Sequence, residues 1–238
     1  MTPLIEVRGL CFRYEDGTAA LRGVDFRLDP GETVVLFGPN GSGKTTFVLH
    51  LNGLLSGEGT VRVCGLPVDK RNIPEIRRKV GIVFQDSDSQ LFMPTVLEDV
   101  AFGLLNRGFD RAAAISRAQA ALATVGMSAA ASRAPYHLSA GEKKRVAVAG
   151  IVAMEPEVLV LDEPTASLDP PGQRSLAELV SHLPQAKILV THDIPFALAL
   201  CQRAVFFQGG VIAAEGTVED IVSRFDWDFS FGGSKLRH

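Results

Sequence analysis

Residues 38–45 read Gly38-Pro39-Asn40-Gly41-Ser42-Gly43-Lys44-Thr45, and this stretch decides the fold of the chain. An apolar run precedes it at 33–37 and a helix-like run follows at 46–51, so the sequence predicts a strand, a tight loop and a helix. Glycines let successive backbone N–H groups point into one concavity, and the helix start adds the positive end of its dipole. We therefore expect an anion-binding loop here.

Two side chains at the end of this loop fit a nucleoside triphosphate. Lys44 can face the outer phosphates as a point charge, and the Thr45 hydroxyl can ligate the Mg²⁺ that accompanies them. A chance glycine-rich turn is the alternative, and the flanking strand and helix patterns disfavour it. We predict that ATP is held by Gly38, Asn40, Gly41, Ser42, Gly43, Lys44, Thr45 and Thr46.

Composition limits the class of protein. The 238 residues are 46% hydrophobic and 21% charged, with a net charge of −3, which argues against a nucleic-acid partner because such partners require a positive field. Three scattered cysteines predict neither a structural metal nor a disulfide framework. The longest apolar stretch, 146–154, falls far short of the roughly 20 residues that cross a bilayer. We expect a cytosolic chain.

The order of predicted elements indicates an α/β protein with a parallel sheet core. Antiparallel strands are expected at 4–14 and 21–28, buried parallel strands at 33–37, 80–84, 158–161 and 187–191, and a hairpin at 203–215. Helices dominate 86–150, where capping-box patterns begin at Thr95 and Ser139. We predict a nucleotide-binding core with a β subdomain over 1–85 and 151–225, an inserted helical subdomain over 86–150, and a tail over 226–238.

The tail begins in a stretch, 225–231, that alternates aromatic with polar residues and holds the only tryptophan. One interpretation is an edge strand or flap that packs on the body. The other is a strip that binds a partner protein. The sequence leaves both open.

A second phosphate-handling element follows the apolar run 158–161. Asp162 stands at the carboxyl end of this predicted strand, where α/β sheets present ligands, and is suited to hold Mg²⁺. Glu163 comes next and can orient the attacking water or accept its proton, which hydrolysis requires. Alone, such an acidic pair is more often a helix cap or a surface pair; with the phosphate loop upstream, catalysis is the better interpretation.

Several further motifs resemble those of ATP-binding cassette (ABC) proteins, in the order of that family, over roughly residues 4–220. They are the signature at 137–145, Gln85 as the Q-loop glutamine, the D-loop at 166–169, the switch histidine His192, and Tyr14 as the aromatic that stacks on adenine. The resemblance implies an ABC ATPase fold, a Mg²⁺ site at Thr45, Gln85 and Asp162, and catalytic roles for Glu163, His192, Gln85 and Lys44.

The signature itself has the chemistry of an anion site. Ser139 at a helix N-cap, followed by Gly141, offers a hydroxyl, backbone N–H groups and a dipole end. In ABC proteins this signature closes on the ATP of a second subunit, so the resemblance implies a head-to-tail dimer, either a homodimer or a pair with a close paralogue. Ala140 and Glu142 depart from the glycine and glutamine of many members, while Ser139 and Gly141 are present.

Residues 84–103 are similar to the Q-loop segment of ATPase subunits of energy-coupling-factor importers, most like the cobalt and nickel group. That resemblance implies a membrane-associated ATPase on the cytoplasmic face, a transmembrane coupling subunit, and a separate membrane subunit that binds the substrate. Leu91 and Phe92, beside Asp86 and Asp88, are expected to be exposed and to receive a partner helix; the alternative places both in the core. A soluble ABC ATPase of DNA repair or translation is the competing class, and the chain lacks the long coiled coil or second cassette usual there.

Overall fold

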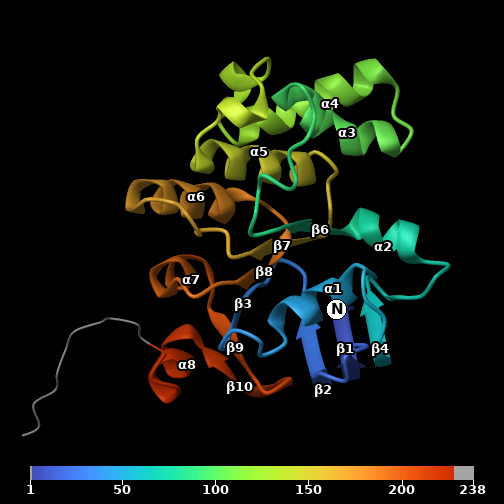
Figure 1. The fold of residues 1–238 in the computed structure, drawn as a ribbon, viewed down its shortest axis with the longest axis vertical. Coiled ribbons are helices and arrows are strands. Elements are labelled where there is room, and N and C mark those ends of the chain that lie inside the picture. The colour runs from blue at the N-terminus through green and yellow to red at the C-terminus, as the bar shows by residue number, and fades with distance from the viewer. Residues whose placement is uncertain (1, 228–238) are drawn as a thin grey trace, which may run out of the picture.

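The computed structural model describes residues 2–227 and contains a six-stranded sheet in the order β10-β9-β3-β8-β7-β6 (Figure 1). Its bounds are β3 (Thr33–Phe37), β6 (Val80–Val83), β7 (Val158–Asp162), β8 (Ala186–Val190), β9 (Arg203–Gln208) and β10 (Val211–Thr217). Adjacent strands from β9 to β6 pair in parallel, and β10 pairs antiparallel with β9 at the edge. The predicted parallel core with a terminal hairpin is confirmed.

A second, antiparallel sheet in the order β2-β1-β4-β5 forms the β subdomain. It comprises β1 (Ile5–Arg13), β2 (Ala19–Leu28), β4 (Glu58–Val63) and β5 (Leu66–Pro67). Helix α1 (Lys44–Leu51) joins the two sheets, because its Phe47 and Leu51 lie in one buried cluster with Ile5 of β1 and Leu36 of β3. The helix that follows the phosphate loop is therefore packed between the two sheets. A short helix, α2 (Ile73–Lys79), leads into β6.

Helices α5 (Ala140–Val152), α6 (Pro170–His182), α7 (Ile194–Leu200) and α8 (Val218–Arg224) lie along the other face of the large sheet, and α3 (Val96–Asn106) and α4 (Arg111–Thr124) pack against α5 beyond it. In β3, Val35 and Phe37 face this helical cluster while Val34 and Leu36 face the β subdomain, so alternate side chains serve two cores. Figure 1 shows α3, α4 and α5 as a layer at the top, far from β1, β2 and β4. This layer is the helical subdomain.

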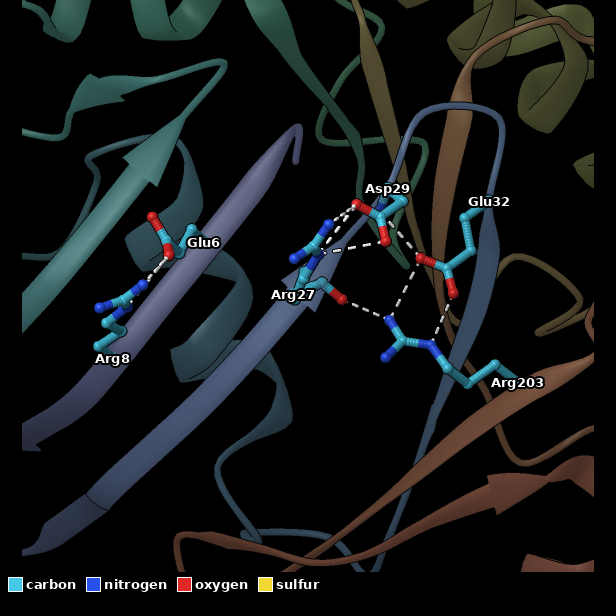
Figure 2. A network of polar contacts seen from close by, with 6 residues as sticks. All are labelled: Glu6, Arg8, Arg27, Asp29, Glu32 and Arg203. Atoms are coloured by element: carbon cyan, nitrogen blue, oxygen red, sulfur yellow. Dashed lines mark hydrogen bonds and ion pairs between the residues drawn. The ribbon is translucent and has the colours of Figure 1, made fainter. Parts of the chain in front are cut away.

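Arg203 fastens the loop before β3 to the edge of the sheet (Figure 2). Its Nε lies 2.7 Å from Glu32 Oε1, its Nη1 lies 2.7 Å from Glu215 Oε1, and its Nη2 donates to the Arg27 carbonyl. The Arg27–Asp29 and Arg8–Glu6 pairs drawn beside it are more exposed and contribute little on their own. Arg203 therefore fixes the start of β3, whose other end carries the phosphate loop.

Within residues 2–227, no helix has both the length and the apolar character needed to cross a membrane.

Candidate active site

The four neighbouring strands β3, β8, β7 and β6 all end at one edge of the sheet, and the predicted chemistry follows those ends. A cavity of about 380 Å³ there is lined by Tyr14, Thr18, Ala19, Ala20, residues 40–46, Gln85, Asp162, Glu163, Val190 and His192. Only Gly38, Ser139 and Gly141 of the predicted site residues are absent from this lining. A larger cavity of about 1130 Å³ on the β subdomain is lined by none of the residues predicted to be catalytic.

The glycines of the phosphate loop are required by close backbone packing. Gly38 has φ 139°, and a Cβ there would lie 2.1 Å from the Phe207 carbonyl oxygen. Gly43 has φ 107°, and its added Cβ would lie 2.6 Å from the Ala20 carbonyl oxygen. Because no side chain fits at either position, these two glycines allow the loop to pack closely against β9 and β2.

Lys44 lies over this loop and is almost fully buried. Its Nζ donates to the carbonyls of Gly38 at 2.6 Å and Pro39 at 3.0 Å. Burial lowers the pKa of Lys44, while the carboxylates of Glu163 and Asp162 oppose that shift. The ammonium is therefore held at the centre of the cradle, between the loop backbone and the acidic end of β7.

Asp162 and Thr45 bring hard oxygen ligands together. Thr45 Oγ1 lies 3.4 Å from Asp162 Oδ2, and burial raises the pKa of Asp162 above its usual value. A hydroxyl and a carboxylate fit Mg²⁺, which usually binds one or two protein oxygens together with phosphates and water. In the described part of the chain, no group of three or more His, Cys, Asp or Glu residues could hold a metal by itself.

Glu163 and His192 contact each other in the lining of the cavity. Glu163 has φ 44°, in the left-handed region, and its N–H donates to the Val190 carbonyl at 2.7 Å, which aims the side chain at the end of β8. Its Oε1 lies 3.3 Å from His192 Nε2. Burial raises the pKa of Glu163, whereas burial and then Lys44 lower the pKa of His192. At neutral pH a neutral imidazole thus faces the carboxylate.

Glu163→Gln is expected to raise the melting temperature at pH 7.5. Because the folded-state pKa of Glu163 is raised, ionisation at neutral pH is less favourable in the folded protein, and stability falls as pH rises through that pKa. The variant removes this penalty, and each kcal/mol recovered is worth about 2–4 °C at this size. Calorimetry at pH 7.5 and pH 4.5 should show the gain shrinking at the lower pH. Glu58→Gln, at an exposed position, is the control, and a variant no more stable than wild type at pH 7.5 contradicts the assignment.

The first residues of the tail pack beside this site, a contact that the sequence did not predict. The Trp227 ring lies 5.7 Å from the His192 ring, centre to centre, and 5.1 Å from the Phe206 ring. Phe225 stacks on Phe206 at 3.7 Å. These contacts agree with the interpretation that the stretch packs on the body, as far as Trp227. The remainder, 228–231, lies outside the described residues.

Tyr14 lies at the wall of the cavity on the β-subdomain side. The residue is 40% exposed, and its hydroxyl lies 2.9 Å from Thr46 Oγ1. The edge-to-face contact with Phe12, at 4.9 Å between centres, braces the ring. Exposure of the ring beside the loop is compatible with adenine stacking, which stays a prediction.

The signature forms a separate site. Ser139 and Gly141 line a different cavity, of about 600 Å³, together with Arg145, Asp169 and Gly172. The predicted capping box is present: Ser139 Oγ accepts from the Glu142 N–H at 3.3 Å, and Glu142 Oε2 accepts from the Ser139 N–H at 2.8 Å. A Cβ at Gly141 would meet only Leu168 Cδ2, at an ordinary 3.8 Å, so packing within this chain does not require glycine there.

Glu142, which stands where many family members have glutamine, carries its own counter-ion. Its Oε1 lies 3.0 Å from Arg133 Nη1. Hydrogen bonding to the Ser139 backbone is the main cause that lowers the pKa of Glu142, and the Arg133 contact adds to it. The carboxylate is therefore ionised and paired beside the signature.

The segment after Gln85 corrects one expectation. Phe92 is 62% exposed and meets Phe102, 36% exposed, edge to face at 4.9 Å. Leu91, by contrast, is half-buried and packs against the core, so the expectation that both residues are exposed is wrong for Leu91. The Asp99 carboxylate holds this part of the segment against the start of α3 by accepting hydrogen bonds from the Phe92 and Met93 N–H groups.

A parallel sheet that gathers a glycine-rich phosphate loop, an acidic strand end and His192 at one edge defines a P-loop nucleotide hydrolase. The family model described as "ABC transporter" matches residues 21–166. The chain is 46% identical over 226 residues to the energy-coupling factor transporter ATP-binding protein EcfA of Methanocaldococcus jannaschii, covering 92% of this chain and 81% of that one. It therefore belongs to the ABC transporter family, and it is an ABC transporter ATPase.

Two solved structures share the fold. CbiO1 from Clostridium perfringens, described as part of the ABC transporter complex cbiONQ, matches with TM-score 0.84 and 34% identity, covering 95% of this chain and 93% of that one. The dimeric structure of MJ0796, a bacterial ABC transporter cassette, matches with TM-score 0.80 and 28% identity, covering 90% and 98%. The ABC ATPase fold predicted from the sequence is confirmed, with its parallel core, antiparallel β subdomain and helical subdomain.

Proposed function

We propose that this chain is the ATP-hydrolysing subunit of an energy-coupling-factor importer, and that it works as a dimer on the cytoplasmic face of the membrane. The observation that carries hydrolysis is the single cavity shared by the phosphate loop, Asp162, Glu163 and His192. The relatives named for energy-coupling-factor transport and for the cbiONQ complex support the importer class. Cobalt or nickel as the transported ion rests on the Q-loop resemblance alone.

The proposed hydrolysis depends on the groups that bind phosphate and Mg²⁺, on the general base Glu163 and on His192. Lys44 and the loop N–H groups bind the outer phosphates, and Mg²⁺, when bound by Thr45, Asp162 and Gln85, neutralises charge that develops on the phosphate oxygens. The Glu163 carboxylate orients a water molecule and accepts its proton. His192 Nε2, 3.3 Å from Glu163 Oε1, fixes that carboxylate and faces the γ-phosphate side of the cavity.

The partner in this dimer is a second copy or a close paralogue. Ser139 and Gly141 line a cavity that their own phosphate loop does not reach, so they are free to complete the site of another chain. Gly141 supports this arrangement, because packing within the chain does not require a residue without a side chain at that position. Two such contacts, related by a two-fold axis, enclose two ATP molecules.

The transmembrane coupling subunit is proposed to dock on an aromatic patch made of Phe92 and Phe102. These rings touch each other and are exposed, and the acidic side chains of Asp86 and Asp88 lie in the same loop. An apolar pair with acidic neighbours suits a helix that carries apolar and basic residues. Because Gln85 begins the same loop, the patch would move with the nucleotide site.

Replacing Phe92 and Phe102 together with serine is expected to prevent assembly with the membrane subunits and to leave ATP binding intact. Each ring that the partner fully buries is worth about 1.5–3 kcal/mol. Co-purification from membranes and the melting temperature of the isolated subunit measure the two effects. Leu198→Ser, another exposed apolar position, should assemble normally, and Leu91→Ser should lower the melting temperature. Normal assembly of the double variant contradicts the patch.

Co-purification of the chain with its membrane subunits, followed by metal analysis of the bound substrate, tests the importer class and the ion together. A soluble ABC ATPase acting in DNA repair or translation would bring no membrane subunit. Recovery of a membrane complex without cobalt or nickel would retain the importer and reject the ion.

A further inference from the structure

A buried lysine joins the Q-loop to the signature helix. Lys144, on α5, is only 3% exposed, and its Nζ donates to the carbonyls of Gln85 at 2.8 Å and Phe84 at 3.1 Å. These carbonyls are about sixty residues away in the chain and directly follow the end of β6. A buried ammonium is costly unless its donors are satisfied, so this contact holds the loop in one place.

Lys144 lies near the N-terminus of α5, the helix that begins at the signature. The same helix begins at the Ser139 N-cap, about 7.5 Å further back along the axis at 1.5 Å per residue. Helix α5 therefore carries the signature at its N-terminus and binds the Gln85 carbonyl through the side chain of Lys144. Gln85 lines the cavity of this chain's own phosphate loop.

Beside this contact, near the start of α5, the two parts are less closely packed. A cavity of about 280 Å³ separates residues 85–88 from the start of α5 and the D-loop. Lys143 bridges it at the surface, with Nζ 2.5 Å from Asp88 Oδ1, but Asp88 is 71% exposed and such pairs are weak. Burial lowers the pKa of Lys144, while Asp162 and Asp86 oppose that shift, so the ammonium also lies within the field of the acidic strand end.

We infer that Lys144 is a positioning residue that couples the two ATP sites of the dimer, by transmitting the state of Gln85 in one site to the signature that serves the other. This inference rests on the proposed dimer. Binding of ATP at Gln85 moves the loop, Lys144 carries the displacement to α5, and Ser139 shifts on the partner's nucleotide. The two hydrolytic sites thereby act together.

The chain provides a matched control. Lys187, on β8, is also buried, and its Nζ donates to the carbonyls of Leu183 at 2.6 Å and Gln185 at 2.9 Å. Lys187→Met therefore removes the same chemistry far from the Q-loop and the signature. Any loss of stability common to both variants is a structural effect.

The test compares Lys144→Met and Lys187→Met with wild type in the full chain. Rates of ATP hydrolysis against ATP concentration give the Hill coefficient, which cannot exceed about 2 for two sites. We expect Lys144→Met to lower it towards 1 and to lower kcat by roughly 2- to 30-fold, with ATP affinity of the monomer unchanged. Lys187→Met should keep the wild-type coefficient. Lys144→Gln retains a donor and is the second variant should Lys144→Met not fold; we expect an intermediate coefficient.

The outcomes separate this inference from the proposed function. Cooperative wild-type hydrolysis with an unchanged coefficient in Lys144→Met, or in Lys144→Gln when only that variant folds, overturns the role of Lys144. An equal fall of the coefficient in Lys187→Met also overturns it, since general destabilisation would be the cause. A wild-type protein that hydrolyses ATP without cooperativity and forms no dimer in ATP contradicts the proposed dimer itself, and the inference with it.

Discussion

Glu163→Gln is expected to lower kcat for ATP hydrolysis by about 10²–10⁴-fold, the usual contribution of a positioned general base. Glutamine keeps the shape of the side chain but cannot accept a proton from water. ATP affinity should stay at the wild-type level, because Lys44 and the loop N–H groups, which we propose bind the phosphates, are unchanged in this variant. Single-turnover hydrolysis and equilibrium binding of a fluorescent ATP analogue measure the two quantities.

Lys44→Ala, unlike Glu163→Gln, is expected to weaken ATP binding. It removes the cation whose Nζ lies over the Gly38 and Pro39 carbonyls, and charge-assisted contacts of this kind are worth about 1.5–3 kcal/mol. ATP binding should therefore weaken and hydrolysis should fall with it. Undiminished turnover by Glu163→Gln would show that another group activates the water.

The strands around the phosphate loop could be predicted from the sequence because each signal there is local. Thr33–Phe37 is a continuous apolar run closed by glycine, and its predicted bounds match the structure. The acidic strand end and the switch histidine follow runs of the same kind, so a parallel sheet places them at one edge. Helix α7 went unpredicted because it is short, although Asp193 caps it and a proline follows at its start.

The end of β6 shows where local signals fail. Phe84 looks like a continuation of the strand, yet its N–H donates to Gln90 Oε1 at 2.9 Å, and a side chain thereby replaces the ladder partner. Other features depend on residues distant in the sequence. They are the burial of Lys144, the packing of Leu91 on the helical core and the contact of Trp227 with His192. Periodicity within one segment carries no information about such partners.

ATP is expected to convert the Glu163→Gln chain from a monomer to a dimer. The slow variant holds ATP long enough for the signature of one chain, at Ser139, to close on the phosphates in the other. Light scattering should show the mass rise from 25.5 kDa to twice that value when ATP is added. ADP should leave the monomer, because it lacks the γ-phosphate that we propose the signature contacts.

Adding Ser139→Arg to Glu163→Gln is expected to abolish this dimer, since a long side chain at the N-cap of α5 blocks the approach of the partner's nucleotide. Loss of the helix N-cap alone lowers the free energy of unfolding by about 0.5–2 kcal/mol. The control variant must therefore lose an N-cap elsewhere and leave the signature unchanged. Thr217→Arg does so, because Thr217 caps α8 by accepting from the Asp220 N–H at 3.1 Å. The Thr217→Arg chain should still dimerise in ATP. If the Ser139→Arg chain dimerises equally well, the signature is not the surface that meets the second nucleotide, and the two cavities of one chain must serve separate purposes.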